Sequence, residues 1–237
     1  MAIQIKQGLF ADPSNFASGA SRPLSSIKYI VVHYTGNDGD SDEANANYSA
    51  KTPNVCASAH YFVDDDSITQ SVPDDYASWS VGKDYSGGKA PLWGKCTNAN
   101  SINVEMCDTK KDGKYAYSAA TYANTVELVR LLKDKYKIPI ESVVRHYDVC
   151  GKICPAWFVG AANEAAWKKF ILDISGSSEV PTVTETITPA YLSGVSDWAR
   201  EAWEWAKNAG FCDGTRPKET ATREEIITLF YRFKGLK

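Results

Sequence analysis

The sequence predicts an α/β fold in which a mixed central β-sheet is flanked by helices, followed by a small all-α module at the C-terminus. Three stretches carry this prediction. Residues 26–36, SIKYIVVHYTG, are apolar on both alternating faces, which is typical of a central strand covered on both sides. Residues 101–108, SINVEMCD, alternate polar with apolar side chains, as a strand with one polar face does. Residues 119–136 repeat apolar side chains at helical spacing, which predicts an amphipathic helix lying on the sheet.

Two further segments complete the predicted body. Residues 58–72, SAHYFVDDDSITQSV, read as a hairpin of two short strands around an acidic turn at 64–67. A second helix is expected where Trp167, Phe170 and Ile174 recur on one side. The strand over 26–36 ends at His33, where strand-to-loop transitions commonly open onto ligand sites.

The chain divides at residues 176–190, GSSEVPTVTETITPA, which are rich in Ser, Thr, Pro and Glu and contain no aromatic residue. This composition predicts an extended linker. We therefore expect a body at 1–175, a linker at 176–190 and a small helical module at 191–237.

Charge and hydropathy exclude several classes of partner. With 26 basic and 29 acidic residues the chain has a formal charge of −3 and no basic stripe, so nucleic acid is not an expected partner. Apolar runs stay well below the roughly 18 residues of a membrane span, so membrane insertion is not expected. The N-terminus lacks an apolar signal segment, and we expect synthesis in the cytoplasm.

The segment VVRHYDVCGKICPAWF, residues 143–158, concentrates groups that can bind metal. His146 and Cys154 are expected on a loop leading into a helix, and His33 ends a core strand. A catalytic zinc ion needs three such ligands and an open position. Spacing alone leaves Cys150 and Cys154 open as disulfide partners, as structural zinc ligands, or as one ligand beside a bystander.

Five motifs spread over most of the body resemble the zinc-dependent N-acetylmuramoyl-L-alanine amidases of phage endolysins, bacterial autolysins and peptidoglycan recognition proteins. They are YIVVHYTGN, SAHYFVDDD, ASWSVG, SINVEMCD and HYDVCGKICP. The resemblance implies zinc (Zn2+) as cofactor, held by His33, His146 and Cys154, and leaves Cys150 as a neighbour. It implies Glu105 and Lys152 as catalytic residues.

The chemistry of these residue types agrees with the implied roles. Zinc makes bound water acidic enough to act as a nucleophile near neutral pH and polarises a carbonyl. Glu105 can then move the proton from the water to the departing amine, and Lys152 can stabilise negative charge on the substrate oxygen. Without the resemblance, Glu105 and Lys152 would be interpreted as ordinary surface charges.

The sequence departs from the family pattern at two positions. Ala59 stands before His60, where one branch of the family has a catalytic tyrosine, so Glu105 must supply that function. Ala156 follows Pro155, where glycine is common. Six polar or aromatic residues near the motifs are candidate substrate contacts: Tyr34, Thr35, Asn37, His60, Trp79 and Asn103. His60 could instead orient a neighbour, and Trp79 could equally belong to the core.

The resemblance implies a peptidoglycan hydrolase that cleaves the amide bond between N-acetylmuramic acid and L-alanine. An endolysin of a bacteriophage, made without a signal peptide and acting at the cell wall after release during lysis, fits the N-terminus. A non-catalytic peptidoglycan-binding receptor on the same fold is the alternative, against which Cys154 argues because such receptors typically lack the cysteine ligand. A purely structural zinc site would need a fourth protein ligand.

The C-terminal module carries its own resemblance. Trp198, Ala202 and Trp205 form a helical stripe, and Thr222 with Glu225 forms a capping box. The pattern resembles one S-layer homology repeat, which implies binding to a cell-wall polymer. Two helices this short bury too little surface to fold alone, so we expect the module to dock on the body or to pair with a second copy as a homodimer.

Overall fold

The computed structural model describes residues 5–176. Residues 177–237, which include most of the expected linker and the whole expected C-terminal module, lie outside the described residues. Within the described part no helix combines the length and the apolar character that crossing a bilayer requires.

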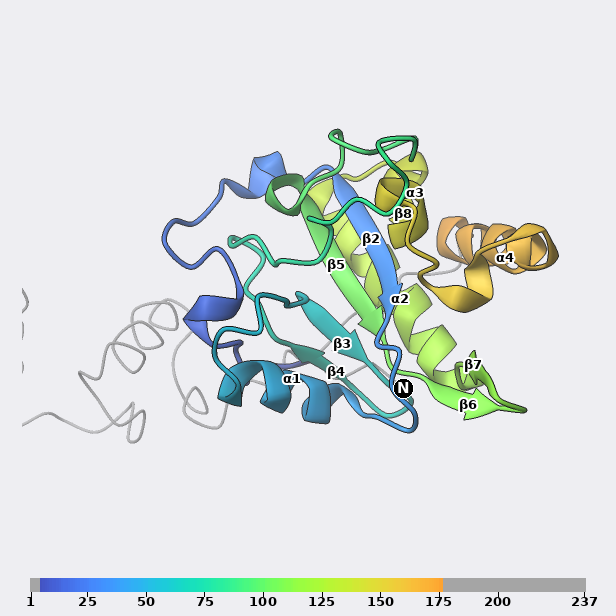
Figure 1. Ribbon diagram of the computed structural model, residues 1–237, viewed down its shortest axis with the longest axis horizontal. Helices are drawn as coiled ribbons and strands as arrows, with labels where there is room; N and C mark the ends of the chain where they lie inside the picture. Colours follow the sequence, from blue (N-terminus) through green and yellow to red (C-terminus); the bar gives the residue numbers. More distant parts are fainter. Residues whose placement is uncertain (1–4, 177–237) are drawn as a thin grey trace, which may run out of the picture. The chain divides into compact units, whose positions relative to one another are not determined.

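A six-stranded mixed sheet forms the centre of the body, in the order β1-β4-β3-β5-β2-β8 (Figure 1). The strands are β1 (Ile5–Lys6), β2 (Tyr29–Tyr34), β3 (Tyr61–Val63), β4 (Ile68–Gln70), β5 (Ser101–Met106) and β8 (Val143–Arg145). Only β3 and β4 pair antiparallel, as the predicted hairpin, and the other neighbours are parallel. A separate antiparallel hairpin joins β6 (Thr109–Lys111) to β7 (Lys114–Ala116).

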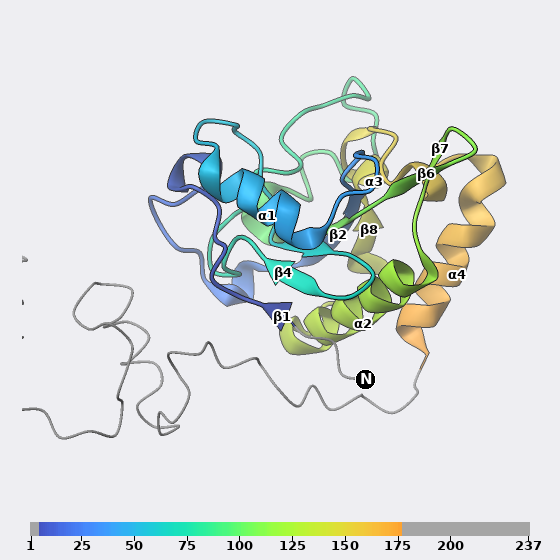
Figure 2. The same ribbon diagram turned by 90° about the horizontal axis from the view of Figure 1, so that it is seen from below.

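Within residues 5–176 four α-helices flank the sheet: α1 (Asp42–Lys51), α2 (Ala119–Tyr136), α3 (His146–Cys150) and α4 (Glu164–Ser175). Short 3-10 turns cover Pro13–Asn15, Leu24–Ser26, Asn98–Asn100, Ile140–Ser142, Ala156–Phe158 and Ala161–Asn163. Figure 2 shows α1 and α2 on opposite faces of the sheet. The predicted α/β fold with a mixed sheet and flanking helices is therefore confirmed for the body.

Helix α2 has the predicted bounds because local signals and packing agree. The Ser118 hydroxyl accepts the backbone N–H of Thr121 at the start, and Lys137 takes a left-handed conformation (φ 55°) at the end. Val129 and Leu132 are fully buried against the sheet. Capping and an apolar stripe together specify where this helix begins and ends.

Alternation along the two central strands separates a core face from a polar face. Ile30, Val32 and Ile102 belong to the main core together with α2 and α4. His33 pairs in register with Glu105, and both point to the opposite face. This second face of the two strands therefore carries the candidate site residues His33 and Glu105.

Helix α1 was not predicted, because its sequence DEANANYSAK has no apolar stripe. One local cap and one tertiary contact stabilise it. The Ser41 hydroxyl caps its start by accepting the N–H of Ala44, and Ala46 is fully buried in a small cluster with Ala59 and Phe62. A helix that is polar nearly all round can form when tertiary contacts bury part of it, and here Asp42, Ala46 and Ser49 are buried.

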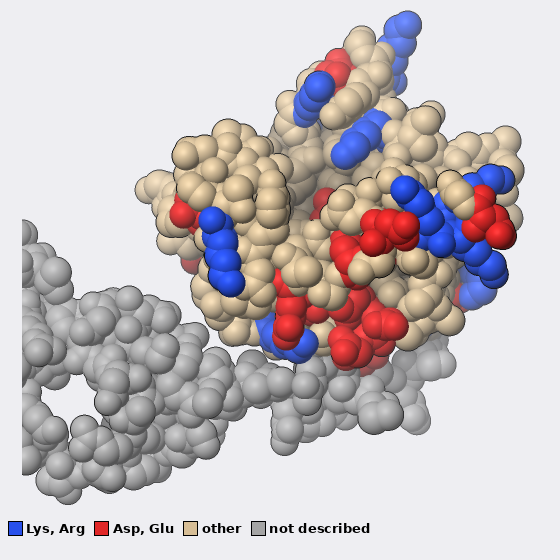
Figure 3. Space-filling view, turned by 60° about the horizontal axis from the view of Figure 1, so that its bottom comes forward, with Lys and Arg blue, Asp and Glu red and all other residues tan. Residues whose placement is uncertain are grey.

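Surface charge on one face agrees with the low net charge. On the face drawn in Figure 3, Lys and Arg side chains are interspersed with acidic ones. This face therefore offers no continuous basic stripe that could follow a phosphate backbone.

Candidate metal centre

The structure brings the three predicted metal ligands together. His33 lies near the end of β2, His146 begins α3, and Cys154 follows α3 in a loop. The Nδ1 atoms of the two histidines are 3.0 Å apart, and the two ring nitrogens and the Cys154 sulfur all lie within 4.8 Å of one another. All three side chains are buried. Three groups that can each donate a lone pair therefore converge on one point.

The expectation that His146 lies on a loop is wrong, since it is the first residue of α3. Asp148 explains the difference, because its carboxylate accepts the backbone N–H of Arg145 at 2.9 Å and also pairs with the Arg145 guanidinium. This side chain caps the first turn of the helix. Beyond the helix, the backbone N–H of Tyr147 donates to the carbonyl of Cys154 at 3.0 Å, which folds the loop back beside His146.

Gly151 makes this return of the chain possible. It ends α3 with φ of +80°, a conformation that favours glycine. A Cβ atom at this position would lie 2.7 Å from the Cβ of Ser86. Both the backbone conformation and the close approach of the segment around Ser86 therefore require glycine here.

Both histidines of the centre are held in the neutral form. Burial lowers the pKa of His33 well below its usual value, and the neighbouring His146 and the charge of Lys152 lower it further. Burial, followed by Lys152, lowers the pKa of His146 to about 3. Neutral imidazole is the form that binds metals.

Cys154 is equally secluded. Burial raises the pKa of its thiol, and the negative charge of Glu105 acts in the same direction, while a hydrogen bond from the backbone N–H of Tyr34 opposes the rise. A buried thiol of this kind becomes a thiolate when it coordinates a metal. Cys150 is also buried and unbridged, and it does not belong to the converging group.

Glu105 lies beside the candidate ligand His33, and one of its carboxylate oxygens has no hydrogen-bond partner among the described residues. Its Oε1 is 3.8 Å from Nδ1 of His33, and its Oε2 is buried without a hydrogen bond among the described residues. Burial raises the pKa of Glu105 to about 8; Lys152 opposes this rise, and Asp40 and Asp108 add to it. A carboxyl group that titrates near neutral pH can both accept and release a proton.

Lys152 is exposed and close enough for its charge to act on the centre. That charge lowers the pKa of both histidines and of Glu105. His33, His146, Cys154 and Glu105 therefore lie together, and the charge of Lys152 acts on them.

The candidate substrate contacts are dispersed. Asn37 is exposed in the loop after β2, and Trp79 is half-buried. The Thr35 hydroxyl donates to Oδ1 of Asp108, which orders this loop. Tyr34 points to the core face, where its ring packs edge-on against Trp157 at a centroid distance of 5.2 Å.

His60 and Asn103 lie inside the protein, and the expectation that they contact substrate is not supported by this placement. Both are 0% exposed. Nδ1 of His60 accepts the backbone N–H of Asn103 at 3.0 Å, and Arg22 approaches Nε2 to 2.9 Å. Burial and the Arg22 cation lower the pKa of His60 to about 4. His60 therefore holds neighbouring residues such as Asn103 in place and does not contact a substrate from the surface.

Asn103 has a role that the sequence reasoning missed. Its Oδ1 lies 2.9 Å from Nε2 of His33. The alternation of the strand over 101–108 already places Asn103 on the face of Glu105, and the parallel register sets it opposite Val31, two residues before His33. The register between β2 and β5 cannot be predicted from the sequence. It makes Asn103, a candidate substrate contact, a hydrogen-bond partner of the candidate metal ligand His33.

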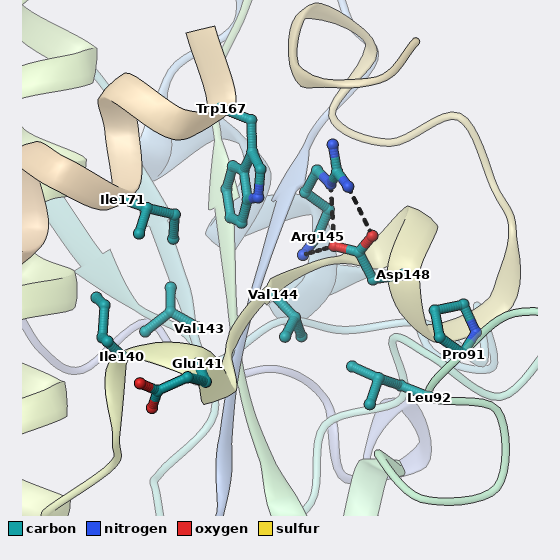
Figure 4. A pocket seen from close by; sticks show the side chains of 10 residues that line it. All are labelled: Pro91, Leu92, Ile140, Glu141, Val143, Val144, Arg145, Asp148, Trp167 and Ile171. Carbon is teal, nitrogen blue, oxygen red and sulfur yellow. Dashed lines mark hydrogen bonds and ion pairs between the residues drawn. The ribbon is translucent and has the colours of Figure 1, made fainter. Parts of the chain in front are cut away.

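A cavity of about 390 Å³ lies elsewhere, between β8 and α4 (Figure 4). Its apolar lining includes Val144, Trp167 and Ile171. The Arg145 guanidinium at its rim is already paired with Asp148 and Glu164. None of the predicted site residues lines it, so this cavity is separate from the candidate metal centre.

The fold is a mixed β-sheet flanked by helices, and one face of the sheet carries two histidines and one cysteine that could hold a metal ion. Residues 23–157, more than half of the chain, match the family model described as N-acetylmuramoyl-L-alanine amidase. The chain therefore belongs to the N-acetylmuramoyl-L-alanine amidase family.

Individual relatives agree with this membership. The chain is 32% identical to the N-acetylmuramoyl-L-alanine amidase CwlL of Bacillus licheniformis over 72% of its own length and 48% of that protein. It is 31% identical to the amidase CwlH of Bacillus subtilis (strain 168) over 69% of its length and 58% of that protein. The chain thus spans about half the length of these relatives.

Solved structures resemble the body as a whole. The structure of PlyL matches with a TM-score of 0.57 and 29% identity, covering 76% of this chain and 100% of that chain. A mutant endolysin from Bacillus subtilis matches with a TM-score of 0.55 and 28% identity, covering 73% of this chain and 99% of that chain. Each match thus covers about three quarters of this chain and nearly all of the solved chain.

Proposed function

We propose that the protein is a zinc-dependent amidase that cleaves the bond between N-acetylmuramic acid and L-alanine in peptidoglycan. The convergence of His33, His146 and Cys154 beside the unpartnered carboxylate of Glu105 is the observation that supports this proposal. Membership in the amidase family supplies the substrate class.

The donor set fits zinc. Zinc prefers tetrahedral nitrogen and sulfur ligands at about 2.0–2.3 Å, which places two bound nitrogens about 3.3 Å apart. The Nδ1 atoms of His33 and His146 are 3.0 Å apart, close to this spacing. Within residues 5–176 the converging group contains no fourth His, Cys, Asp or Glu ligand, which suits a catalytic rather than a structural zinc site. A zinc ion held there would activate water and polarise the scissile carbonyl.

Glu105 and Lys152 complete the proposed mechanism. Glu105 accepts a proton from the attacking water at Oε1 or Oε2 and returns it to the amine of L-alanine as that amine leaves. Burial raises its pKa in the metal-free protein, and the positive charge of a zinc ion beside it would lower the pKa again, towards the ionised form that accepts a proton. The exposed Lys152 ammonium group stabilises the negative charge that develops on the carbonyl oxygen.

Digestion of purified cell walls tests the proposal. We expect new L-alanine amino termini without new reducing sugar ends, and we expect chelation to abolish them. New reducing ends would instead show a glycosidase. Binding to walls without release of amino termini would show a non-catalytic peptidoglycan receptor.

We further propose that residues 191–237 bind a cell-wall polymer and that the protein acts at the wall after release during lysis, as a phage endolysin does. The tryptophan stripe and capping box of the module support this proposal. A chain shortened to residues 1–176 should keep amidase activity on soluble fragments and lose retention on intact walls in a pull-down. Equal retention of the full and the shortened chain would contradict the proposal.

A further inference from the structure

A chain of buried polar side chains leads away from His33 into the protein. Nε2 of His33 lies 2.9 Å from Oδ1 of Asn103, and Nδ2 of Asn103 lies 3.0 Å from the Ser78 hydroxyl and 3.2 Å from the Ser101 hydroxyl. Ser78, Ser101 and Asn103 are 0% exposed, and His33 is 1% exposed. Solvent therefore cannot replace any of these hydrogen bonds.

Backbone carbonyls determine the direction in which the hydroxyl groups donate. The Ser101 hydroxyl donates to the carbonyl of Thr97 at 2.8 Å, so only its lone pairs remain for Asn103. The Ser80 hydroxyl donates to the carbonyl of Ser58, so it can only accept from Ser78. Ser78 can therefore donate its own proton to the Ser80 oxygen, because the single lone pair on Nδ1 of His60 already accepts the backbone N–H of Asn103.

These directions fix the orientation of the Asn103 amide. Both neighbouring hydroxyl groups present lone pairs, so the NH₂ group of Asn103 must face them and its oxygen must face His33. An amide oxygen can only accept, so the proton on His33 must sit on Nε2. The lone pair of neutral His33 is consequently on Nδ1, the atom that lies 3.0 Å from Nδ1 of His146.

We infer that Asn103 is a positioning residue that selects the Nε2–H tautomer of His33, and that Ser78 and Ser101 orient Asn103 for this role. The tautomer holds the Nδ1 lone pair of His33 towards Cys154 and His146. Partners that fix the tautomer of a ligating histidine raise metal affinity by about 10- to 100-fold. The effect on metal rests on the proposed zinc function, whereas the tautomer does not.

Nitrogen-15 correlation spectra of the metal-free full-length chain read the tautomer directly. The chain contains three histidines, so His33 can be assigned by comparing spectra of His60→Gln and His146→Gln variants. We expect the wild-type His33 ring to carry its proton on Nε2. In Asn103→Leu we expect a mixture of both tautomers, and in Asn103→Asp, which keeps an acceptor oxygen for His33, we expect the Nε2–H form to return.

Metal affinity is the second readout. Zinc titration should show roughly 10- to 100-fold weaker binding in Asn103→Leu and a smaller loss in Asn103→Asp. Since Asn103→Leu could fail to fold, the single variants Ser78→Ala and Ser101→Ala keep the asparagine and remove one oriented acceptor each. We expect each of them to populate the second His33 tautomer in part.

Two results would overturn the inference: a wild-type His33 protonated on Nδ1, or an unchanged His33 tautomer in a folded Asn103→Leu variant. Failure of the proposed function looks different. If the wild-type protein bound no zinc, the zinc proposal would fall while the tautomer spectra would still report on Asn103.

Discussion

Glu105 and His33 lie directly opposite each other on neighbouring parallel strands, with Oε1 of the carboxylate 3.8 Å from Nδ1 of the imidazole. One register thus places the candidate proton carrier next to the first candidate metal ligand. Because both side chains come from directly paired residues of two neighbouring strands, their separation is set by backbone pairing and not by a flexible loop.

Replacing Glu105 by glutamine should lower the rate of amide hydrolysis by roughly 10²- to 10⁴-fold, because the proton carrier is lost. Bound zinc should remain, since Glu105 is not one of the converging ligands. Glu127→Gln is the matched control, because Glu127 also has a buried oxygen without a partner but belongs to α2. Activity of Glu105→Gln equal to that of this control would remove Glu105 from the mechanism.

Cys154→Ser should weaken zinc binding by more than about 100-fold, which exceeds the loss typical of a group that only supports a ligand. Cys150→Ser offers a close control, because both cysteines are buried and stand four residues apart. Metal content after dialysis separates them. Retention of zinc by the Cys154 variant would show that Cys154 is not a ligand, and loss of zinc by the Cys150 variant would show that Cys150 is one.

Gly151→Ala should destabilise the fold by about 2–5 kcal/mol, because a left-handed alanine and a steric overlap both contribute. Gly113→Ala isolates the first contribution, since Gly113 has φ of +73° with nothing within 4 Å of a Cβ, and it should cost about 1–2 kcal/mol. Chemical denaturation measures both. Equal losses would mean that the contact with Ser86 is unimportant.

Acid should destabilise the metal-free protein through its buried histidine His60. His60 has a pKa of about 4 when folded and about 6.5 when unfolded, so between these values the unfolded chain binds the extra proton. Stability therefore falls as the pH drops from about 6.5 to about 4, by roughly 3 kcal/mol for this residue alone. His60→Gln should make the dependence of the unfolding free energy on pH shallower by about one proton; an unchanged slope would exclude His60.

The sequence predicted most clearly those parts of the body in which local signals and burial coincide. Helix α2 combines a serine cap with an apolar stripe, and the alternation in β5 already put Asn103 and Glu105 on one face. Helix α1 escaped prediction because its sequence has no such stripe. The approach of Asn103 to His33 also escaped, since it depends on the register of two strands separated by about 70 residues in sequence.

The residues of the candidate metal centre were likewise predicted in part. Residue types and the family resemblance predicted which side chains to consider, and the structure brings His33, His146, Cys154 and Glu105 together. Exposure could not be judged from the sequence in the same way. His60 and Asn103 are polar residues near the motifs, yet packing places both in the interior.

His33 and His146 are 113 residues apart in sequence, so a metal ion bound to both would link distant parts of the fold. A metal ion held by both would close a loop containing nearly half of the chain and would tie β2 to α3. The two histidines come together only when the intervening strands and helices are folded. Unfolding of the protein and release of the metal ion are therefore coupled. Ligand binding to the native state alone raises its stability by mass action, and the resistance of the protein to heat should therefore depend on the concentration of free zinc.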